Sequence, residues 1–342
     1  MNTTLKTALA FTCLLLAAGG IYYYKTRPSR MFRIGIVSCP SIAFHEHLVG
    51  LLKKQIATDK RFIMEDFAVP SVNDQLSCSA ICNTALESKA DIILAAGITC
   101  SQCMVQAAAK RKSTKPIVFF GVASPTTYGI ISALDKPEKY VTGIASSQGF
   151  DENFNAADLL MHAKPQVKRV LLPYLVCPDD NEKVVKAAAA TFAEHGVGVT
   201  ILPIYDTAEA LSMVAGKLPT HDAMMYFEND GLVSCATGLG KLASQHQVTM
   251  FASSFDGVEC AALSYSANLE KLAKAAFLMA RHVVVKNGTY VPVKVLNVKR
   301  YFRINLPICK EQGLKELNPS TVISAIQQDS RLALMHKNTV VT

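Results

Sequence analysis

The chain of 342 residues contains no tryptophan, and it has no dense stripe of lysine and arginine interleaved with aromatic residues. Half of its formal net charge of +8 comes from the first thirty residues, which carry four basic side chains and no acid. Residues 31–342 hold 31 Lys+Arg against 27 Asp+Glu, a net charge of +4. Because nucleic-acid binding requires a concentrated basic patch, we expect no nucleic-acid partner.

Signatures of catalysis are also missing. The sequence has no Gly-rich phosphate loop, no His-Glu-x-x-His motif and no Gly-x-Ser-x-Gly nucleophile elbow. None of the eight histidines sits in a recognisable acid–base constellation. His45 and His47 are two residues apart, which places them on different faces of a helix. We therefore expect no catalytic residue and no cofactor, and the chain is not predicted to be an enzyme.

An uncharged apolar run, TALAFTCLLLAAGGIYYY, occupies residues 7–24 between Lys6 and a basic stretch. A basic start, an apolar run and small residues are typical of a secretory signal peptide. The length of the run and its terminal tyrosines equally suit a membrane anchor. Residues 1–30 are therefore predicted to be a signal peptide or an N-terminal membrane anchor. Both outcomes imply an exported protein, in the periplasm or at the cell surface.

From residue 31 onward, short apolar segments alternate with amphipathic ones. The segment FHEHLVGLLKKQIA, for example, places Phe44, Leu48 and Leu52 on one face of a helix. Alternating strands and helices predict parallel sheets covered on both faces, and two successive series predict an α/β protein of two doubly wound lobes. The expected strands are 33–38, 62–69, 91–97, 116–122 and 141–145 in the first series, and 169–174, 199–205, 223–227, 248–253 and 261–265 in the second.

The loops that follow the strands are short and polar. In a doubly wound sheet these loops form the binding edge, and two such edges facing each other would enclose a small polar molecule. The candidate ligand-binding residues of the first lobe are Ser38, Cys39, Thr99, Cys100, Ser101 and Ser124. Those of the second lobe are Tyr174, Asp180, Asn181, Glu228, Asn229, Ser254 and Asp256.

Ten cysteines are spread along the chain. The spacing Cys78-x3-Cys82-x17-Cys100-x2-Cys103 superficially satisfies that of a zinc site, and Cys39 belongs toward the same end of the first lobe. A soft-metal or thiol–disulfide site is one interpretation. The interpretation we favour is small buried hydrophobic side chains with at most one disulfide, so no metal ligand is assigned.

Several blocks resemble, in order and spacing, the ABC-transporter substrate-binding proteins of the type I periplasmic-binding fold, in particular the tryptophan- and tyrosine-binding group. Among them are ADIILAAGITCSQCMVQAAA, KPIVFFGVASPTTYGII, VTGIASSQGFDENFNAADLL and ECAALSYSANLEKLAKAAFLMA. The resemblance covers about residues 33–315. It implies no chemistry: two lobes close by a hinge around a ligand, and the closed form docks onto a membrane permease.

The resemblance also implies three crossings between the lobes, which we expect near 145, 262 and 292. The first lobe would then comprise residues 31–145 plus 262–291. The second lobe would comprise residues 146–261 plus 292–330, and residues 331–342 would form a tail.

The family's site motifs fall on particular residues of this chain. Its helix-start motif falls on Thr99 and Ser101, where a hydroxyl and free helix N–H groups suit the α-carboxylate of an amino acid. Its polar pair falls on Glu228 and Asn229, where an acid would pair with a ligand ammonium. An Asn/Ser-bearing loop matches residues 179–181 more loosely. The family's Asp-Pro is replaced here by Ser124-Pro125, which removes a charge.

The expected function is therefore that of an exported, monomeric solute-binding protein of an ABC importer. It would capture a small polar ligand, such as an amino acid with an aromatic side chain, and deliver it to a membrane permease. Two alternatives stay open: a sensory or scaffold receptor with the same fold, and a cysteine-based metal- or redox-binding protein.

Overall fold

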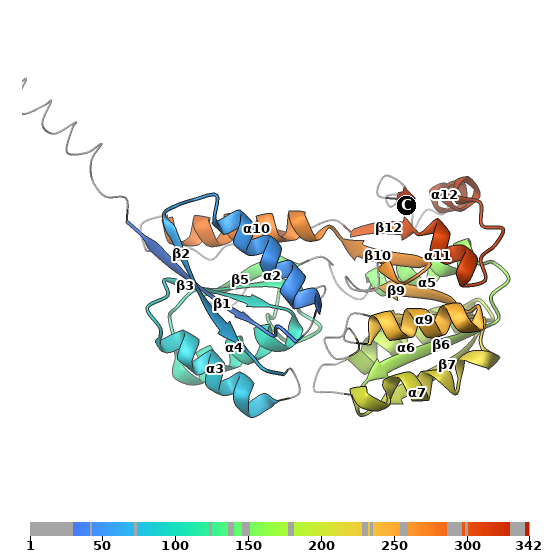
Figure 1. The fold of residues 1–342 in the computed structure, drawn as a ribbon, viewed down its shortest axis with the longest axis horizontal. Coiled ribbons are helices and arrows are strands. Elements are labelled where there is room, and N and C mark those ends of the chain that lie inside the picture. Colours follow the sequence, from blue (N-terminus) through green and yellow to red (C-terminus); the bar gives the residue numbers. More distant parts are fainter. Residues whose placement is uncertain are drawn as a thin grey trace, which may run out of the picture.

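Two lobes lie side by side in the computed structural model, each built on its own sheet (Figure 1). The structure describes residues 30–41, 43–71, 74–122, 125–135, 140–145, 151–176, 181–227, 232, 235–253, 259–285, 296–297, 300–328 and 339–341. The predicted α/β class with two parallel-sheet lobes is confirmed.

The sheet of the first lobe has the strand order β11-β5-β4-β3-β1-β2, and its described strand pairs are all parallel. Apolar runs without interruption, such as IILAA, give strands that are buried along their whole length. The strands are β1 (Phe32–Ser38), β2 (Phe62–Ala68), β3 (Ile92–Ala96), β4 (Ile117–Val122), β5 (Val141–Ala145) and β11 (Leu296–Asn297). The helices are α2 (Ala43–Ile56), α3 (Gln75–Glu87), α4 (Ile98–Arg111) and α10 (Leu269–Val285).

The sheet of the second lobe has the order β13-β12-β10-β9-β8-β6-β7. Its strands are β6 (Arg169–Leu175), β7 (Gly198–Ile204), β8 (Ala223–Phe227), β9 (Thr249–Ser253), β10 (Leu263–Ala267), β12 (Arg300–Ile304) and β13 (Thr339–Val341). One pair, β10 with β12, is antiparallel, whereas the other described pairs of this sheet are parallel. The helices are α5 (Asp151–Ala163), α6 (Asn181–Glu194), α7 (Ala210–Ala215), α9 (Ala236–His246), α11 (Leu306–Glu311) and α12 (Pro319–Gln328), with 3₁₀ turns η1 (Thr207–Glu209) and η2 (Leu218–Thr220).

The second sheet carries a core on each face. Leu172 of β6 and Met225 of β8 belong to one hydrophobic cluster, whereas their neighbours Leu171 and Met224 belong to the other. Successive side chains of a strand point to opposite faces, so the alternation accounts for the two clusters. Helices therefore cover both faces of the sheet, so the strand ends are where functional side chains can lie.

The chain changes sheets three times among the described residues. The first change follows β5, as expected near residue 145. The second falls after β10, because this strand pairs with β9 and β12 while α10 packs in the core of the first lobe. The third falls between β11, which pairs with β5, and β12. The crossings expected near 262 and 292 thus lie a few residues too early.

The expected C-terminal tail contains an element of the fold. Residues 339–341 form β13, which pairs in parallel with β12 at the edge of the second sheet. A strand of three residues has too short a pattern to be recognised in sequence, and its pairing with β12 is a tertiary contact. The description of residues 331–342 as a simple tail is therefore corrected.

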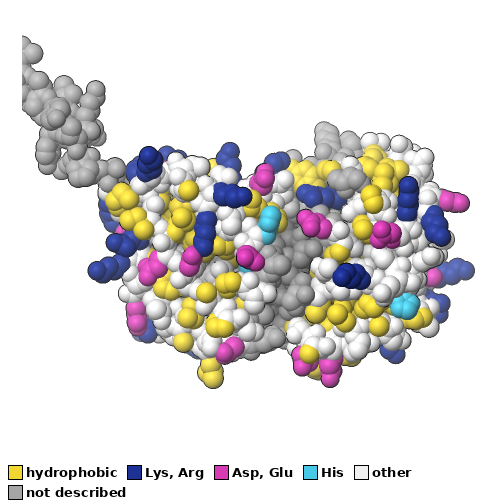
Figure 2. Space-filling view, viewed as in Figure 1, with side chains coloured by type: hydrophobic (Ala, Val, Ile, Leu, Met, Phe, Trp, Pro, Cys, Tyr) yellow, Lys and Arg dark blue, Asp and Glu magenta, His cyan; other side chains and the backbone are white. Residues whose placement is uncertain are grey.

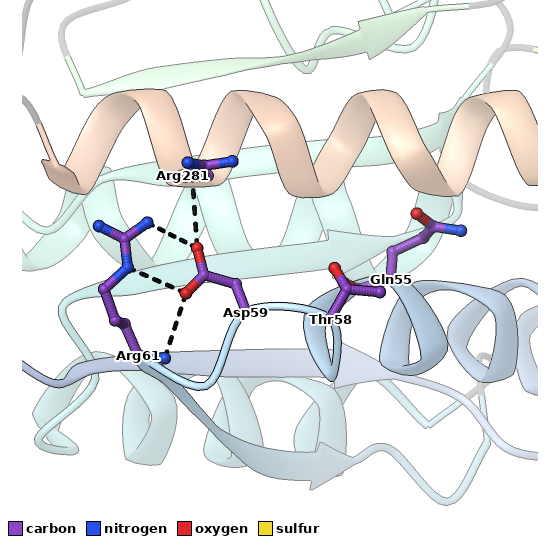
Figure 3. A network of polar contacts seen from close by, with 5 residues as sticks. All are labelled: Gln55, Thr58, Asp59, Arg61 and Arg281. Carbon is purple, nitrogen blue, oxygen red and sulfur yellow. Dashed lines mark hydrogen bonds and ion pairs between the residues drawn. The ribbon is translucent and has the colours of Figure 1, made fainter.

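A charged network holds α10 against the first lobe. The Asp59 carboxylate accepts hydrogen bonds from Arg61 Nε at 2.9 Å and Arg61 Nη2 at 2.6 Å, and Arg281 Nε of α10 lies 3.6 Å from it (Figure 3). The guanidinium of Arg61, followed by smaller contributions that include Arg281, lowers the pKa of Asp59 to about 2. The helix that returns from the second lobe is thereby tied to the loop between α2 and β2.

The surface shows no concentration of one charge on the face drawn in Figure 2, where acidic and basic side chains are interspersed over both lobes. Among the described residues, no helix is both long enough and apolar enough to cross a membrane. The predicted export segment, residues 1–30, lies outside the described part of the chain except for Arg30. The guanidinium of Arg30 lies 3.0 Å from the carboxylate of Asp91.

Candidate functional site

The candidate site of the first lobe is the edge at which β1, β3 and β4 end. Val37 is level with Ala95, and Ala96 is level with Phe120, so the three strands end together. From β1 the chain passes outward to β2 and then returns to β3 on the other side of β1. Ligands of doubly wound sheets bind at the carboxyl edge where the strand order reverses in this way.

Gly97 joins β3 to α4 at this edge, and it packs directly against His45 of α2. Its φ is 77°, and a Cβ placed on it would lie 1.9 Å from His45 Nε2. The imidazole is fully buried, and its Nδ1 accepts a hydrogen bond from the backbone N–H of Cys39 at 3.3 Å. His45 thus connects the end of β1 with the start of α4.

His45 was not among the expected site residues. The sequence offered one signal for it, a histidine in the helix that follows the first strand. His45 and His47 together do not form a site, because the side chain of His47 lies on the exposed part of the helix. The close approach to Gly97 depends on how α2 packs over the sheet, which no local pattern indicates.

The first turn of α4 contains three of the predicted ligand contacts. The Ser101 hydroxyl is buried and donates to the carbonyl oxygens of Gly97 and Ala95, the latter at 3.2 Å. Ser101 therefore closes the turn from β3 into α4. Thr99 is buried at the same turn, with 7 % of its surface exposed. The predicted contacts of Thr99 and Ser101 with a ligand stay predictions.

Ser38 and Cys39, at the end of β1, are also buried, and the Cys39 thiol lies 3.0 Å from the Ser41 hydroxyl. Gln102 Nε2 donates to the Tyr128 carbonyl at 2.8 Å, which ties the start of α4 to the segment after β4. Ser124 lies outside the described residues. The structure thus brings Ser38, Cys39, Thr99 and Ser101 together at one edge.

Cys100 points elsewhere. Its side chain interacts with the thiol of Cys78 on α3, and Cys78, Cys82 and Cys103 have sulfur atoms that all lie within 4.8 Å of one another. None of the eight described cysteines forms a disulfide with another of them. Hydrogen bonds from neighbouring thiols, first that of Cys100, lower the pKa of Cys78. The thiol of Cys103 raises the pKa of Cys82. The thiol of Cys78 raises the pKa of Cys103 to about 12. The neighbouring thiols thus favour ionisation of Cys78 over that of Cys82 or Cys103.

The second lobe has an equivalent edge. Phe227 of β8 is level with Ser253 of β9, and the register of β6 with β8 brings Tyr174 to the same height. Tyr174 is 9 % exposed and packs in a hydrophobic cluster. Burial, followed by the nearby Glu182 of α6, raises the pKa of the Tyr174 phenol. Asn181 is the first residue of α6. Five predicted contacts lie outside the described residues: Asp180, Glu228, Asn229, Ser254 and Asp256.

In each lobe, the strands that precede the predicted ligand contacts end at one edge of the sheet. Two such lobes joined by three crossings define a type I periplasmic-binding-protein fold. Residues 59–327 match the model of the ABC transporter substrate binding protein family, so the chain belongs to this family. The resemblance noted in the sequence is thereby confirmed. The family is defined by binding a substrate and not by a class of reaction.

Known relatives agree with this assignment. The chain is 25% identical over 257 residues to a protein named "Tyrosine-binding protein" from Clostridioides difficile, covering 73% of this chain and 71% of the relative. An ABC domain in complex with L-Trp from Streptococcus pneumoniae superimposes with a TM-score of 0.70 at 18% identity, covering 84% of this chain and 99% of that one. The ligand-free, open structure of a substrate binding protein from Clostridium difficile gives a TM-score of 0.58 at 20% identity, covering 91% and 100%. The two solved structures establish the likeness of the fold.

Proposed function

We propose that the protein is an exported solute receptor of an ABC importer that captures an aromatic amino acid between the carboxyl edges of its two lobes. The observation that carries the proposal is the edge of the first lobe, where a buried strand, a glycine with positive φ and the first turn of α4 meet at the reversal of strand order. The names of the curated relative and of the tryptophan-bound structure support an aromatic amino acid.

The α-carboxylate of the ligand would bind at the start of α4. The first N–H groups of a helix have no partners within the helix, and their dipoles favour an anion. Gly97 lets the backbone turn sharply into the helix, and His45 fills the space behind it. Thr99 supplies a hydroxyl at this turn, so the first lobe offers donors and no carboxylate among its described edge residues.

The α-ammonium of the ligand would bind to the second lobe. Glu228 and Asn229 follow β8, whose last residue is level with the last residue of β9. A carboxylate and an amide oxygen at this edge would accept charge-assisted hydrogen bonds. Ser124 replaces the acid that the family carries in the first lobe, so Glu228 would hold the ammonium with less help from the opposite lobe. Tyr174 borders the same edge and offers an aromatic face.

Capture would proceed by closure of one lobe onto the other. Three short connections between compact lobes permit a hinge motion with little change inside each lobe. A ligand that contacts both edges stabilises the closed form, and the closed form is the one that a membrane permease would recognise. The relative described as open in its ligand-free state fits this cycle.

The absence of tryptophan provides a direct test, because emission from bound L-tryptophan is read without a background from protein indole. We expect L-tryptophan or L-tyrosine, at 100-fold above its Kd, to raise the melting temperature by about 5 °C. Indole, which lacks the carboxylate and the ammonium, is the matched control and should bind far more weakly. If no amino acid changes either the emission or the melting temperature, the proposed ligand is wrong.

Transport is a separate part of the proposal. The chain should bind a membrane-embedded permease more tightly with ligand than without it, which co-purification from detergent in both states would show. A sensory receptor with the same fold would bind its ligand equally well and show no such permease. The presence of permease and ATPase genes beside the gene for this chain would favour the importer.

A further inference from the structure

Four cysteines lie together inside the first lobe, away from the hydroxyls at its edge. Cys78 and Cys82 are four residues apart on α3, and Cys100 and Cys103 are three apart on α4. These spacings place each pair on one face of its helix, and the two helices lie next to each other on the same side of the sheet (Figure 1). Helix packing has therefore brought the two pairs face to face.

The sulfur atoms are close enough to share one ion. Those of Cys78, Cys82 and Cys103 lie within 4.8 Å of one another, and Cys100 interacts with Cys78. Zn–S bonds of about 2.3 Å in a tetrahedron imply sulfur–sulfur distances of about 3.8 Å. Three thiols lie within reach of one ion, and the thiol of Cys100, beside Cys78, is the candidate for the fourth position.

The chemistry of the donors restricts the ion. The group consists of sulfur atoms alone, with no carboxylate or imidazole in it. Thiolates select soft or borderline cations such as Cu⁺ and Zn²⁺, whereas Mg²⁺ and Ca²⁺ require oxygen ligands. Three of the four side chains are completely buried and Cys103 is 7 % exposed, so an ion bound here would be shielded from water.

Apolar packing does not require cysteines to gather in one place. Cys309 shows how the chain buries a single cysteine, in an apolar cluster where its thiol donates to the carbonyl of Ala262. In an exported protein, neighbouring free thiols are subject to oxidation unless an ion or a disulfide engages them. The thiols of the cluster are held on two packed helices, which suits an ion better than a flexible redox pair.

We propose that Cys78, Cys82 and Cys103, with Cys100 as the fourth thiol, bind one thiophilic d¹⁰ cation, Zn²⁺ or Cu⁺, in the interior of the first lobe. The bound ion would fasten α3 to α4, whose first turn belongs to the ligand-binding edge. The site stands on its own geometry and does not depend on which amino acid the cleft takes.

The test uses the full chain, purified and made metal-free under anaerobic conditions. Titration with Zn²⁺ against a chromophoric chelator, and separately with Cu⁺ against a Cu⁺-specific chelator, should each be read for one equivalent per chain. We expect one of the two ions to bind stoichiometrically and to raise the melting temperature. X-ray absorption of that complex should show a sulfur-only shell, at about 2.3 Å for zinc.

Cys82→Ser is the informative variant, because Cys82 lies on α3 and contributes nothing to the edge. Loss of outer-shell partners already weakens metal sites by about 10–100-fold, so loss of a direct ligand should weaken binding by more than about 100-fold. Cys309→Ser, in the second lobe, is the matched control and should bind the ion as the wild type does. Both variants should still bind the amino acid, which separates this site from the proposed function.

Thiol protection provides a readout that needs no variant. In urea at a concentration that makes the buried thiols of the metal-free chain reactive, the bound ion should slow alkylation of the four cysteines, mapped by mass spectrometry, and leave that of Cys235 unchanged. The proposal is overturned if neither ion binds stoichiometrically, if Cys82→Ser binds as tightly as the wild type, or if the exported protein carries a disulfide within this cluster.

Discussion

Gly97 shows how one residue determines the shape of the proposed carboxylate site. Its φ of 77° is accessible to glycine at little cost, and a methyl group there would overlap the His45 ring. We expect Gly97→Ala to lower the free energy of unfolding by at least about 1–2 kcal/mol from backbone strain alone, and to abolish amino-acid binding. Urea unfolding and L-tryptophan emission would measure the two effects.

A second glycine provides the control for this substitution. Gly50 lies inside α2, and a Cβ there would meet nothing within 4 Å. Gly50→Ala should raise the stability by up to about 1 kcal/mol and leave binding unchanged. Equal losses of stability in the two variants would contradict the role assigned to the Gly97–His45 contact.

Gln312 is a buried amide whose side chain bonds to four backbone groups. Its Oε1 accepts from the N–H groups of Met250 and Ala262, and its Nε2 donates to the carbonyls of Gly240 and Cys260. Gln312→Met keeps the shape of the side chain but leaves the four buried backbone groups without these hydrogen bonds. We expect a loss of about 3 kcal/mol in the free energy of unfolding, measured with urea.

The matching surface substitution tests whether burial is the cause. Gln328, at the end of α12, is exposed, so Gln328→Met should change the stability by no more than about 0.5 kcal/mol. A loss below about 1 kcal/mol for Gln312→Met would show that water replaces the missing hydrogen bonds and that the amide is not a structural anchor.

At the scale of elements, the strands were the best predicted part of the fold. The ten expected strands all appear as β1 to β10, with ends shifted by at most two residues. Several of them, such as β3 and β8, are continuous apolar runs between polar breaks. The two-residue β11 and the three-residue β13 were missed, since they exist only through pairing with β5 and β12. The second and third crossings were misplaced because strand pairing, and not a local pattern, determines where the chain leaves each sheet.

The attachment of α10 to the first lobe gives a prediction about pH. The pKa of Asp59, about 2 in the folded chain against the ordinary 3.8, makes the carboxylate stabilising above about pH 4, and this contribution disappears as the pH falls to 2. With 16 % of its side chain exposed, screening reduces the effect, so Asp59→Asn should cost about 1 kcal/mol at pH 7. The difference between variant and wild type should vanish near pH 2 in acid-unfolding curves.

Asp66→Asn is the control for this pH dependence. The carboxylate of Asp66 lies 2.6 Å from Lys53 Nζ, but both side chains are well exposed, so this pair should contribute less than about 0.5 kcal/mol. An Asp59→Asn variant that loses stability equally at pH 2 and pH 7 would mean that the amide perturbs the packing. The charge of Asp59 would then have no part in holding α10.

For the molecule as a whole, the family and the two lobes were predictable, because the resemblance rests on several blocks spread along the chain and the family match spans residues 59–327. The site was predictable to the level of the strand ends and not to the level of side chains. The sequence places Cys100 and Ser101 in the same turn. In the folded chain, the Ser101 hydroxyl donates to the backbone, whereas the Cys100 side chain lies toward α3. His45 reaches the edge by the same kind of packing.

Ligand binding should move the two lobes relative to each other. If the ligand bridges the two carboxyl edges, its binding energy favours the closed form, and the chain should become more compact when L-tryptophan or L-tyrosine binds. Small-angle X-ray scattering should show a smaller radius of gyration with ligand than without it, and Gly97→Ala, defective at one edge, should stay at the larger value. Indole at the same concentration should also leave the radius unchanged, because it cannot engage both charged ends. Tight binding of the amino acid without any compaction would place the ligand on a single lobe and contradict capture by closure.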